Sequence, residues 1–207
     1  MTTETHQPFD PSTAVEELTY AFDGVFTRDE IVGAVSRAQR ALQPQATVHT
    51  FLPVLIKRYA EELLSADAQA DGRTAKTVPE LLFVCVQNAG RSQIAAALAE
   101  HLAPGKVHVR SAGSQPTGEL NPLAVAVLAE RGIELADAYP KPLSDSVLHA
   151  ADIIVTMGCG ETCPVFPGKR YEDWDVSDPE GKTLDEVRDI RDDIQARITA
   201  LLRDLDL

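Results

Sequence analysis

The first third of the chain places apolar residues at the spacing of amphipathic helices. Asp10 is a candidate N-cap with Pro11 at the first helical position, and an apolar face follows. The segment Thr27-Arg28-Asp29-Glu30 has the form of a capping box, which predicts the start of a second helix. Gln43-Pro44 is the expected end of that helix, because proline cannot continue it.

A third helix is predicted from about Thr50, where a broad apolar stripe begins. The stretch at 66–77, ADAQADGRTAKT, lacks large apolar residues and contains a glycine, so we interpret it as a linker. The sequence therefore predicts a small three-helix bundle with its linker over residues 1–77 and a second domain over residues 78–207.

Beyond the linker the pattern changes to alternating strands and helices. The apolar run Leu81–Val86 is typical of a buried parallel strand. The further elements expected are a helix at Ser92–His101, a strand at Val107–Arg110, a helix at Pro122–Arg131 closed by Gly132, a strand at Ile153–Thr156, a weaker strand near Arg170 and an amphipathic helix at Leu184–Leu205. This order predicts an α/β fold, with an open parallel four-stranded sheet and helices on both faces.

Charge and cysteine content narrow the classes of function. The chain has 19 basic and 32 acidic residues, a formal net charge of -13 and no basic run, which argues against nucleic acid or an anionic membrane as a partner. Neither a secretion signal nor an apolar stretch of membrane-spanning length is present, so we expect a cytoplasmic protein. Three cysteines, an odd number, favour thiols with chemical roles over a structural disulfide framework.

The segment Cys85–Ser92 follows the first predicted strand and opens the next helix, where open α/β sheets bind ligands. Such a loop directs backbone N–H groups and the positive end of the helix dipole at one point, which suits phosphate, arsenate or sulfate. The same field favours the reactive thiolate of a cysteine placed there. The residues expected to bind the oxyanion are Val86, Gln87, Asn88, Ala89, Gly90, Arg91 and Ser92.

Within this loop, Arg91 can present a planar fork to two oxyanion oxygens. Asn88 can adopt a left-handed turn or brace the loop with its amide, and the Ser92 hydroxyl can hydrogen-bond the Cys85 sulfur. The alternative is that Cys85 is an inert buried cysteine at the end of a strand and Arg91 a surface cation. The strand before the motif and the helix after it favour the oxyanion site.

The region from Pro79 to about Leu205 resembles the low-molecular-weight tyrosine phosphatase superfamily and, within it, the thioredoxin-coupled arsenate reductases. The matching features are the Cys85–Ser92 loop, Ser111-Ala112-Gly113, Asp178-Pro179, Gln93 and a later cysteine pair. The helical region from Asp10 to Ala66 is similar to an N-terminal extension of some actinobacterial members.

The resemblance implies that Asp178 is the general acid that protonates the leaving oxygen. Without it, a simple turn would be the better interpretation of the Asp-Pro pair. Phosphatases of the superfamily commonly have an aromatic residue after Asp-Pro, whereas Glu180 follows here and disfavours phosphotyrosine. Several also have a second cysteine just before the loop arginine, and that position is Gly90 in this chain.

Cys159 and Cys163 follow the third predicted strand, which should bring them to the same edge of the sheet as Cys85. Residues four apart share a helical face, so the two sulfurs could meet and exchange a disulfide. The alternatives are two incidental thiols or two ligands of a soft metal. The five histidines show no ligand spacing relative to the pair, and no metal site is predicted.

The resemblance therefore implies reduction of arsenate to arsenite. Cys85 would attack the oxyanion, and Cys159 and Cys163 would carry the resulting disulfide to an external thiol reductant. No bound cofactor is expected; the reductant would be thioredoxin, with mycothiol as the alternative because the spacing of the later cysteines is short. The rival functions are a low-molecular-weight tyrosine phosphatase and a non-enzymatic sensor that binds arsenite or a soft metal. A leftover apolar face of the N-terminal helices could form a homodimer.

Overall fold

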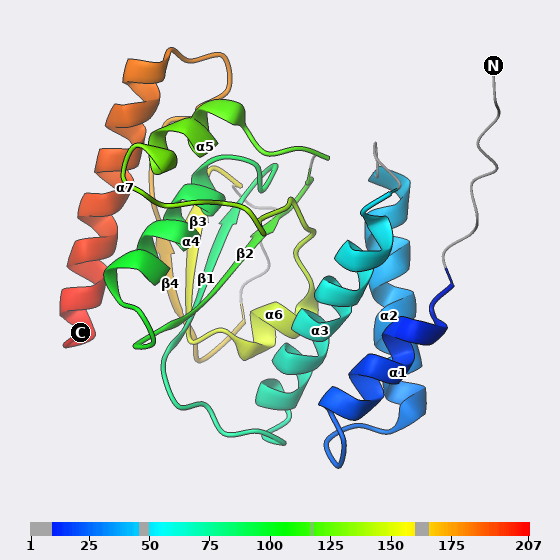
Figure 1. Cartoon of the computed structure of the whole chain (residues 1–207). Helices are drawn as coiled ribbons and strands as arrows, with labels where there is room; N and C mark the ends of the chain where they lie inside the picture. The colour runs from blue at the N-terminus through cyan, green and yellow to red at the C-terminus, as the bar shows by residue number, and fades with distance from the viewer. Residues whose placement is uncertain (1–9, 46–49, 117, 160–165) are drawn as a thin grey trace, which may run out of the picture. The chain divides into compact units, whose positions relative to one another are not determined.

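The structure is a computed structural model and describes residues 10–45, 50–116, 118–159 and 166–207 (Figure 1). The chain divides into two compact units, Met1–Ala68 and Gln69–Leu207. This division falls earlier in the sequence than the boundary expected near Thr77. In the part of the chain that the structure describes, no helix combines the length and the apolar character needed to cross a bilayer.

The N-terminal unit is helical, as the sequence predicted. Its elements are α1 (Ser12–Ala21), α2 (Arg28–Leu42), the 3-10 turn η1 (Gln43–Gln45) and α3 (Leu52–Ala70), whose last two residues fall in the second unit. Ion pairs join Lys57 on α3 to Glu17 on α1, and Arg37 on α2 to Asp67 on α3. The homodimer through these helices stays a prediction.

The beginnings of the first two helices test the capping predictions. At α2 the Glu30 N–H donates to Thr27 Oγ1 at 3.4 Å and the Thr27 N–H donates to the Glu30 carboxylate at 2.7 Å, which confirms the capping box. At α1 the prediction is wrong by one residue, because Pro11 occupies the N-cap and the helix begins at Ser12. Asp10 still satisfies a free N–H of the first turn by accepting from Ser12 at 2.9 Å.

The third helix is longer than predicted. It runs through the first part of the expected linker to Ala70, and Ala66 and Ala68 are buried. Alanine is the strongest helix former, so this stretch continues the helix without large apolar side chains. The turn that follows contains Gly72 at φ +69°, a left-handed conformation that glycine adopts without steric cost.

The second unit is built on a four-stranded sheet. Its strands are β1 (Glu80–Cys85), β2 (His108–Gly113), β3 (Ile153–Met157) and β4 (Arg170–Asp173). They are all parallel and lie in the order β2-β1-β3-β4. This confirms the predicted open parallel sheet and makes β1 a central strand, buried along its whole length.

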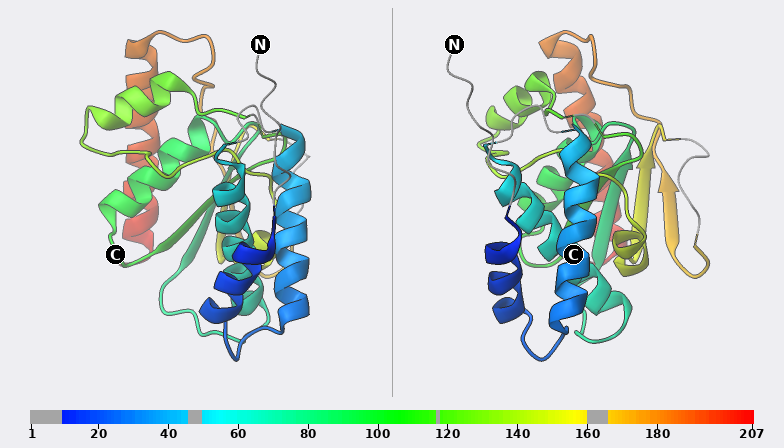
Figure 2. Two further views of the ribbon diagram at one scale, coloured as in Figure 1. Left: turned by 45° about the vertical axis from the view of Figure 1, so that its right-hand side comes forward. Right: turned by 90° about the vertical axis from the view of Figure 1, so that its right-hand side faces the viewer.

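Helices cover both faces of the sheet (Figures 1 and 2). They are α4 (Arg91–Leu102), α5 (Pro122–Ala129), α6 (Asp145–Ala150) and α7 (Leu184–Asp204). Helices α4, α5 and α7 pack together on one face, and α6 lies against β1 on the other. Both α5 and α6 belong to the connection between β2 and β3, so this connection contributes a helix to each face.

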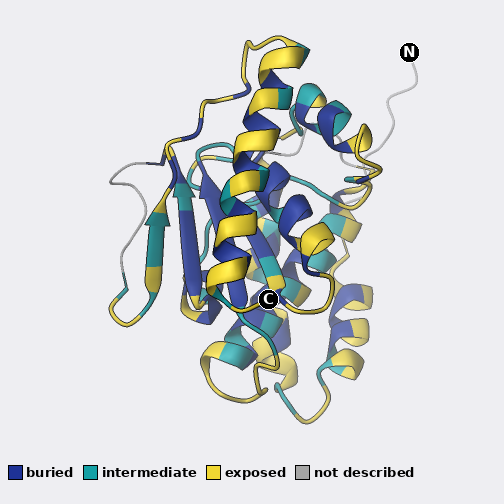
Figure 3. Ribbon diagram, turned by 90° about the vertical axis from the view of Figure 1, so that its left-hand side faces the viewer, coloured by how far each residue is buried: buried dark blue, intermediate teal, exposed yellow. Residues whose placement is uncertain are grey.

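Apolar side chains of α7 and of the strands form the core of this unit. The predicted apolar face of α7 is confirmed, since all six of its residues are buried while the outer face of the helix is exposed (Figure 3). These residues are Val187, Ile190, Ile194, Ile198, Leu201 and Leu202. Phe83, in the middle of β1, lies 6.0 Å between ring centroids from Trp174, the only tryptophan of the chain.

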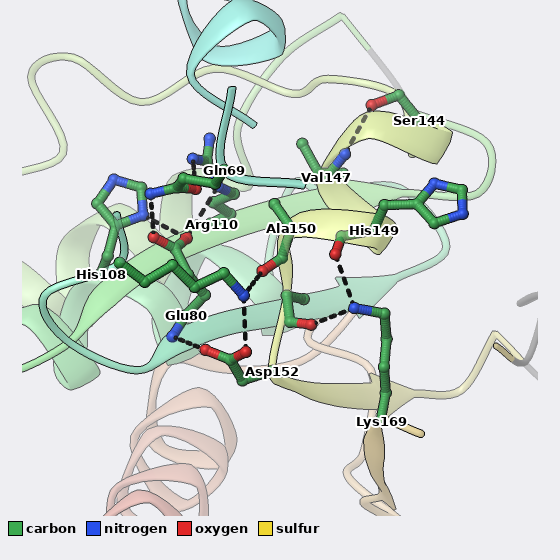
Figure 4. Close-up of polar contacts among 12 residues, drawn as sticks. Gln69, Glu80, His108, Arg110, Ser144, Val147, His149, Ala150, Asp152 and Lys169 are labelled. Carbon is green, nitrogen blue, oxygen red and sulfur yellow. Dashed lines mark hydrogen bonds and ion pairs between the residues drawn. The ribbon is translucent and has the colours of Figure 1, made fainter. Parts of the chain in front are cut away.

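A buried ionic cluster holds the amino ends of β1 and β2 together (Figure 4). The Glu80 carboxylate accepts hydrogen bonds from Arg110 Nε at 3.2 Å and from Gln69 Nε2 at 2.6 Å, and its other short contact is His108 Nδ1 at 2.7 Å. Glu80 and Arg110 are both buried. Burial raises the pKa of Glu80, but the His108 hydrogen bond and the Arg110 charge outweigh it and leave that pKa below its ordinary value.

Two lysines hold the carboxyl end of α6, a short helix that the sequence analysis did not predict (Figure 4). Lys169 donates to the carbonyl oxygens of His149 and Ala151 at 2.7 and 2.5 Å, and Lys76 donates to that of Ala150 at 2.6 Å. Cations at a helix C-terminus satisfy free carbonyl groups and favour the helix dipole. Ionic contacts therefore hold the amino ends of the strands. The predicted oxyanion loop lies at the opposite, carboxyl ends of the strands.

Candidate active site

The loop between β1 and α4 forms the centre of the site. Cys85 is the last residue of β1 and Arg91 is the first of α4, so the loop lies at the carboxyl edge of the sheet as expected. Asn88 has φ +51°, the left-handed conformation that its side chain tolerates better than most. The loop carbonyls of Val86 and Ala89 accept hydrogen bonds from the segment that follows β2, at 2.8 and 2.9 Å.

The Cys85 sulfur is a free thiol that lies inside the loop. It is only 2% exposed and accepts a hydrogen bond from the Asn88 N–H at 3.2 Å. The Ser92 hydroxyl lies 3.0 Å from the same sulfur. One backbone N–H and one hydroxyl group of the loop therefore lie against the sulfur on which the predicted chemistry depends.

The direction of the Ser92 hydrogen bond follows from the contacts of Asn88. The backbone N–H of Lys141 donates to Asn88 Oδ1 at 2.9 Å, and since a backbone N–H can only donate, this contact fixes the orientation of the amide. Asn88 Nδ2 therefore donates to Ser92 Oγ at 2.8 Å. The serine hydroxyl accepts that bond and can direct its own proton to the Cys85 sulfur.

Two further residues brace the loop from behind. Gln93 Nε2 lies 3.0 Å from the Asn88 carbonyl oxygen and 3.1 Å from that of Tyr139, and it can donate to both. Gly113, at the end of β2, is pressed so closely against the loop that a β-carbon there would lie 2.7 Å from the Val86 oxygen and 2.9 Å from the Asn88 nitrogen. The loop conformation is thus held by several elements and not by its own sequence alone.

Arg91 and Asp178 meet beside the loop. Arg91 is 8% exposed; its Nη2 donates to the Asp178 carboxylate, and its Nη1 lies 3.4 Å from the Val176 carbonyl oxygen. The other oxygen of Asp178 accepts the Glu180 N–H at 3.0 Å. The segment between β4 and α7, called the late loop below, was predicted to carry the acid. It is therefore in contact with the arginine expected to bind the oxyanion.

The ring of Pro179 seats this late loop on the oxyanion loop at Gly90. A β-carbon at position 90 would lie 2.5 Å from Pro179 Cγ, which is closer than carbon atoms approach without displacement. Absence of a side chain at Gly90 thus allows the two loops to close on each other.

Cys159 lies at the same edge of the sheet. Met157 of β3 is in register with Cys85 of β1, and Cys159 follows two residues later, 5% exposed. Cys159 is disulfide-bonded, whereas Cys85 is a free thiol. Cys163 lies outside the described residues, so its predicted place near Cys85 stays a prediction.

Some residues of the site carried no recognisable signal in the sequence. Gly113 was noted only as part of a matching motif, and Val176, Tyr139 and Lys141 contribute backbone atoms, which any residue type could supply. Gly158 packs against Arg91 and belongs to none of the motifs recognised in the sequence. These contacts join segments far apart in the chain, so no local pattern records them.

Both units of the chain match models of known protein families. Residues 80–207 match the family model described as low molecular weight phosphotyrosine protein phosphatase, and residues 12–68 match the model of a protein-tyrosine-phosphatase-like N-terminal domain. A solved structure of a thioredoxin-dependent arsenate reductase from Corynebacterium glutamicum is 42% identical, with a TM-score of 0.86, over 94% of this chain and 96% of that chain.

Two further relatives each match 62% of the chain. A putative arsenate reductase of Halobacterium salinarum is 35% identical over 133 residues, which are 62% of this chain and 94% of the relative. A YwlE arginine phosphatase from Geobacillus stearothermophilus is 29% identical, with a TM-score of 0.54, over 62% of this chain and 93% of that chain. The chain therefore belongs to the low molecular weight phosphotyrosine protein phosphatase family, and arsenate reductases are among its relatives there.

Proposed function

We propose that this protein reduces arsenate to arsenite and is regenerated by thioredoxin. The observation that carries the proposal is the convergence of a braced, buried thiol, Cys85, with Arg91, Asp178 and a disulfide-bonded second cysteine, Cys159, at one edge of the sheet. The names of its relatives support the same activity, since the Corynebacterium glutamicum structure is that of a thioredoxin-dependent arsenate reductase.

In the first step the oxyanion binds to the loop N–H groups of residues 86–90 and to Arg91. The Cys85 thiolate then forms a bond to arsenic, and one arsenate oxygen leaves as water with a proton from Asp178. The product is a covalent thiol-arsenate adduct with arsenic still in its oxidised state. The Asn88 N–H and the Ser92 hydroxyl hold the attacking sulfur in its place inside the loop.

In the second step the Cys159 thiolate attacks the Cys85 sulfur. The sulfur–arsenic bond breaks and its electron pair stays on arsenic, so arsenite leaves and a Cys85–Cys159 disulfide forms. Cys163 then attacks Cys159, which moves the disulfide to Cys159–Cys163 and frees Cys85.

The reductant completes the cycle by two-electron reduction of the last disulfide. Thioredoxin is the dithiol that we propose, and such a reducing partner implies a cytoplasmic reaction. A phosphatase would use Cys85, Arg91 and Asp178 but would have no use for the later cysteines, and Glu180 places a negative charge where an aryl group would bind.

The test is arsenate-dependent oxidation of NADPH by the full chain with thioredoxin and thioredoxin reductase. The wild type should turn over repeatedly. The Cys163→Ser variant should release no more than one arsenite per chain and stop with Cys85 and Cys159 joined, which peptide mass mapping would detect. Full turnover by Cys163→Ser would contradict the relay. Turnover with mycothiol but not with thioredoxin would identify mycothiol as the reductant. Hydrolysis of aryl phosphates without reduction of arsenate would favour the phosphatase function.

A further inference from the structure

Gly158 lies in direct contact with the arginine of the oxyanion site. It joins the end of β3 to Cys159 and has φ +74°. A β-carbon built at this position would lie 2.5 Å from Nη1 of Arg91, 3.4 Å from its Cζ and 3.6 Å from its Nη2. The bare α-carbon of Gly158 therefore faces the guanidinium group, which fills the space where any other residue would begin its side chain.

The guanidinium group is restricted on its other sides as well. Its Nη1 approaches the Val176 carbonyl oxygen and its Nη2 is bound to the Asp178 carboxylate, both on the late loop. With 8% of the residue exposed, Arg91 has little free space in which to turn away. Gly158 and the late loop thus set the position of Arg91 from two separate segments of the chain.

We propose that Gly158 is a positioning residue for oxyanion binding, a role that rests on the proposed function of Arg91. Two parallel N–H···O bonds from a guanidinium group require alignment of its plane with the oxyanion oxygens. A methyl group at position 158 needs about 3.5–4.0 Å from its neighbours, so Nη1 must move by about 1 Å or more. Because the displaced atoms are the end of a flexible side chain, the fold should survive while the site loses its geometry.

The simpler explanation is that position 158 is glycine only because its backbone is left-handed. Gly132, at the end of α5, separates the two explanations. It has nearly the same conformation, φ +73°, but a β-carbon there would meet no atom within 4 Å. Gly132→Ala therefore introduces the same kind of backbone strain without any contact with the site.

The experiment is calorimetric titration of the full chain with inorganic phosphate, comparing wild type, Gly158→Ala and Gly132→Ala. Phosphate resembles arsenate in shape and charge but is not reduced. We expect the Kd of Gly158→Ala to rise about 10- to 100-fold, the range set by loss of one charge-assisted hydrogen bond, and that of Gly132→Ala to stay at the wild-type value. In the arsenate assay Gly158→Ala should raise KM more than it lowers kcat.

A second background isolates the contact itself. Lysine lacks the Nη atoms, so in an Arg91→Lys chain the further change Gly158→Ala should weaken phosphate binding much less than it does in the wild type. Equal weakening in both backgrounds, weakening by Gly132→Ala to the same extent, or an unchanged Kd for Gly158→Ala would each overturn the inference. If phosphate binding follows the expected pattern but the wild type reduces no arsenate, the proposed function fails and the role of Gly158 stands.

Discussion

The contact between Gly90 and Pro179 allows a prediction whose size can be worked from the structure. A β-carbon at position 90 would lie 2.5 Å from Pro179 Cγ and 3.4 Å from its Cδ. Ordinary carbon–carbon contacts are about 3.5–4.0 Å, so in Gly90→Ala the proline ring must retreat by about 1 Å or more. Asp178 precedes this proline in the chain, and its carboxylate should move away from the oxyanion loop with it.

A displacement of about 1 Å of a catalytic group can cost about 100-fold in rate. We therefore expect kcat for arsenate to fall about 100-fold in Gly90→Ala, or about 2.7 kcal/mol in activation free energy. Phosphate affinity should change much less, because Arg91 and the loop N–H groups remain in place. The measurements are kcat in the thioredoxin-coupled arsenate assay and the Kd for phosphate by calorimetry.

A compensating substitution distinguishes the collision from other effects of the methyl group. Alanine at position 179 lacks the Cγ and Cδ atoms. Adding Gly90→Ala to a Pro179→Ala chain should therefore lower kcat much less than adding it to the wild type. An unchanged kcat in Gly90→Ala would refute the reasoning. So would a fall in kcat that is equally large in the wild-type and Pro179→Ala backgrounds.

Three other predictions concern the thiol, the ionic cluster and an exposed glycine. Ser92→Ala removes the hydroxyl beside the Cys85 sulfur and should slow alkylation of that thiol by iodoacetamide near neutral pH about tenfold; alkylation at the wild-type rate would exclude this role. The pKa of Glu80 is lowered in the folded protein, so its stabilising contribution is present above the ordinary glutamate pKa of about 4.3 and is lost as the pH falls below that value. Urea unfolding should therefore show Glu80→Gln less stable than wild type at pH 7, with a difference that narrows in acid; a difference independent of pH would contradict the assignment. Gly33 is exposed inside α2 and a β-carbon there meets nothing within 4 Å, so Gly33→Ala should raise the free energy of unfolding by about 0.5–1 kcal/mol, and a loss of stability in chemical denaturation would count against it.

Much of the fold could be predicted because its signals are local. The capping box at Thr27, the apolar face of α7 and the buried run of β1 each lie within one stretch of sequence. The short helix α6 was missed because six residues show too little periodicity, although Ser144 caps it by accepting the Val147 N–H at 3.4 Å. The end of α3 was misjudged because alanine extends a helix without showing an apolar face.

The candidate site likewise contains residues that the sequence could predict and residues that it could not. Cys85, Arg91 and Ser92 fall within eight consecutive residues, so the strand before them and the helix after them were enough to suggest an oxyanion loop. The contact of Asp178 with Arg91 spans 87 positions and was not predicted, although the family resemblance gave Asp178 its role as the acid. Gly158 could not be recognised in advance, because its importance lies in the missing side chain and in an arginine that folding brings beside it.

The single tryptophan determines what an unfolding experiment on this protein measures. Trp174 is 6% exposed, donates from Nε1 to Glu172 at 2.8 Å and packs near Phe83, all within the C-terminal unit. Tryptophan emission therefore follows the loss of that unit alone, while far-ultraviolet circular dichroism sums the helices of both. If the two compact units melt independently, the two curves will not coincide, and a midpoint from fluorescence will describe the catalytic unit and not the whole chain.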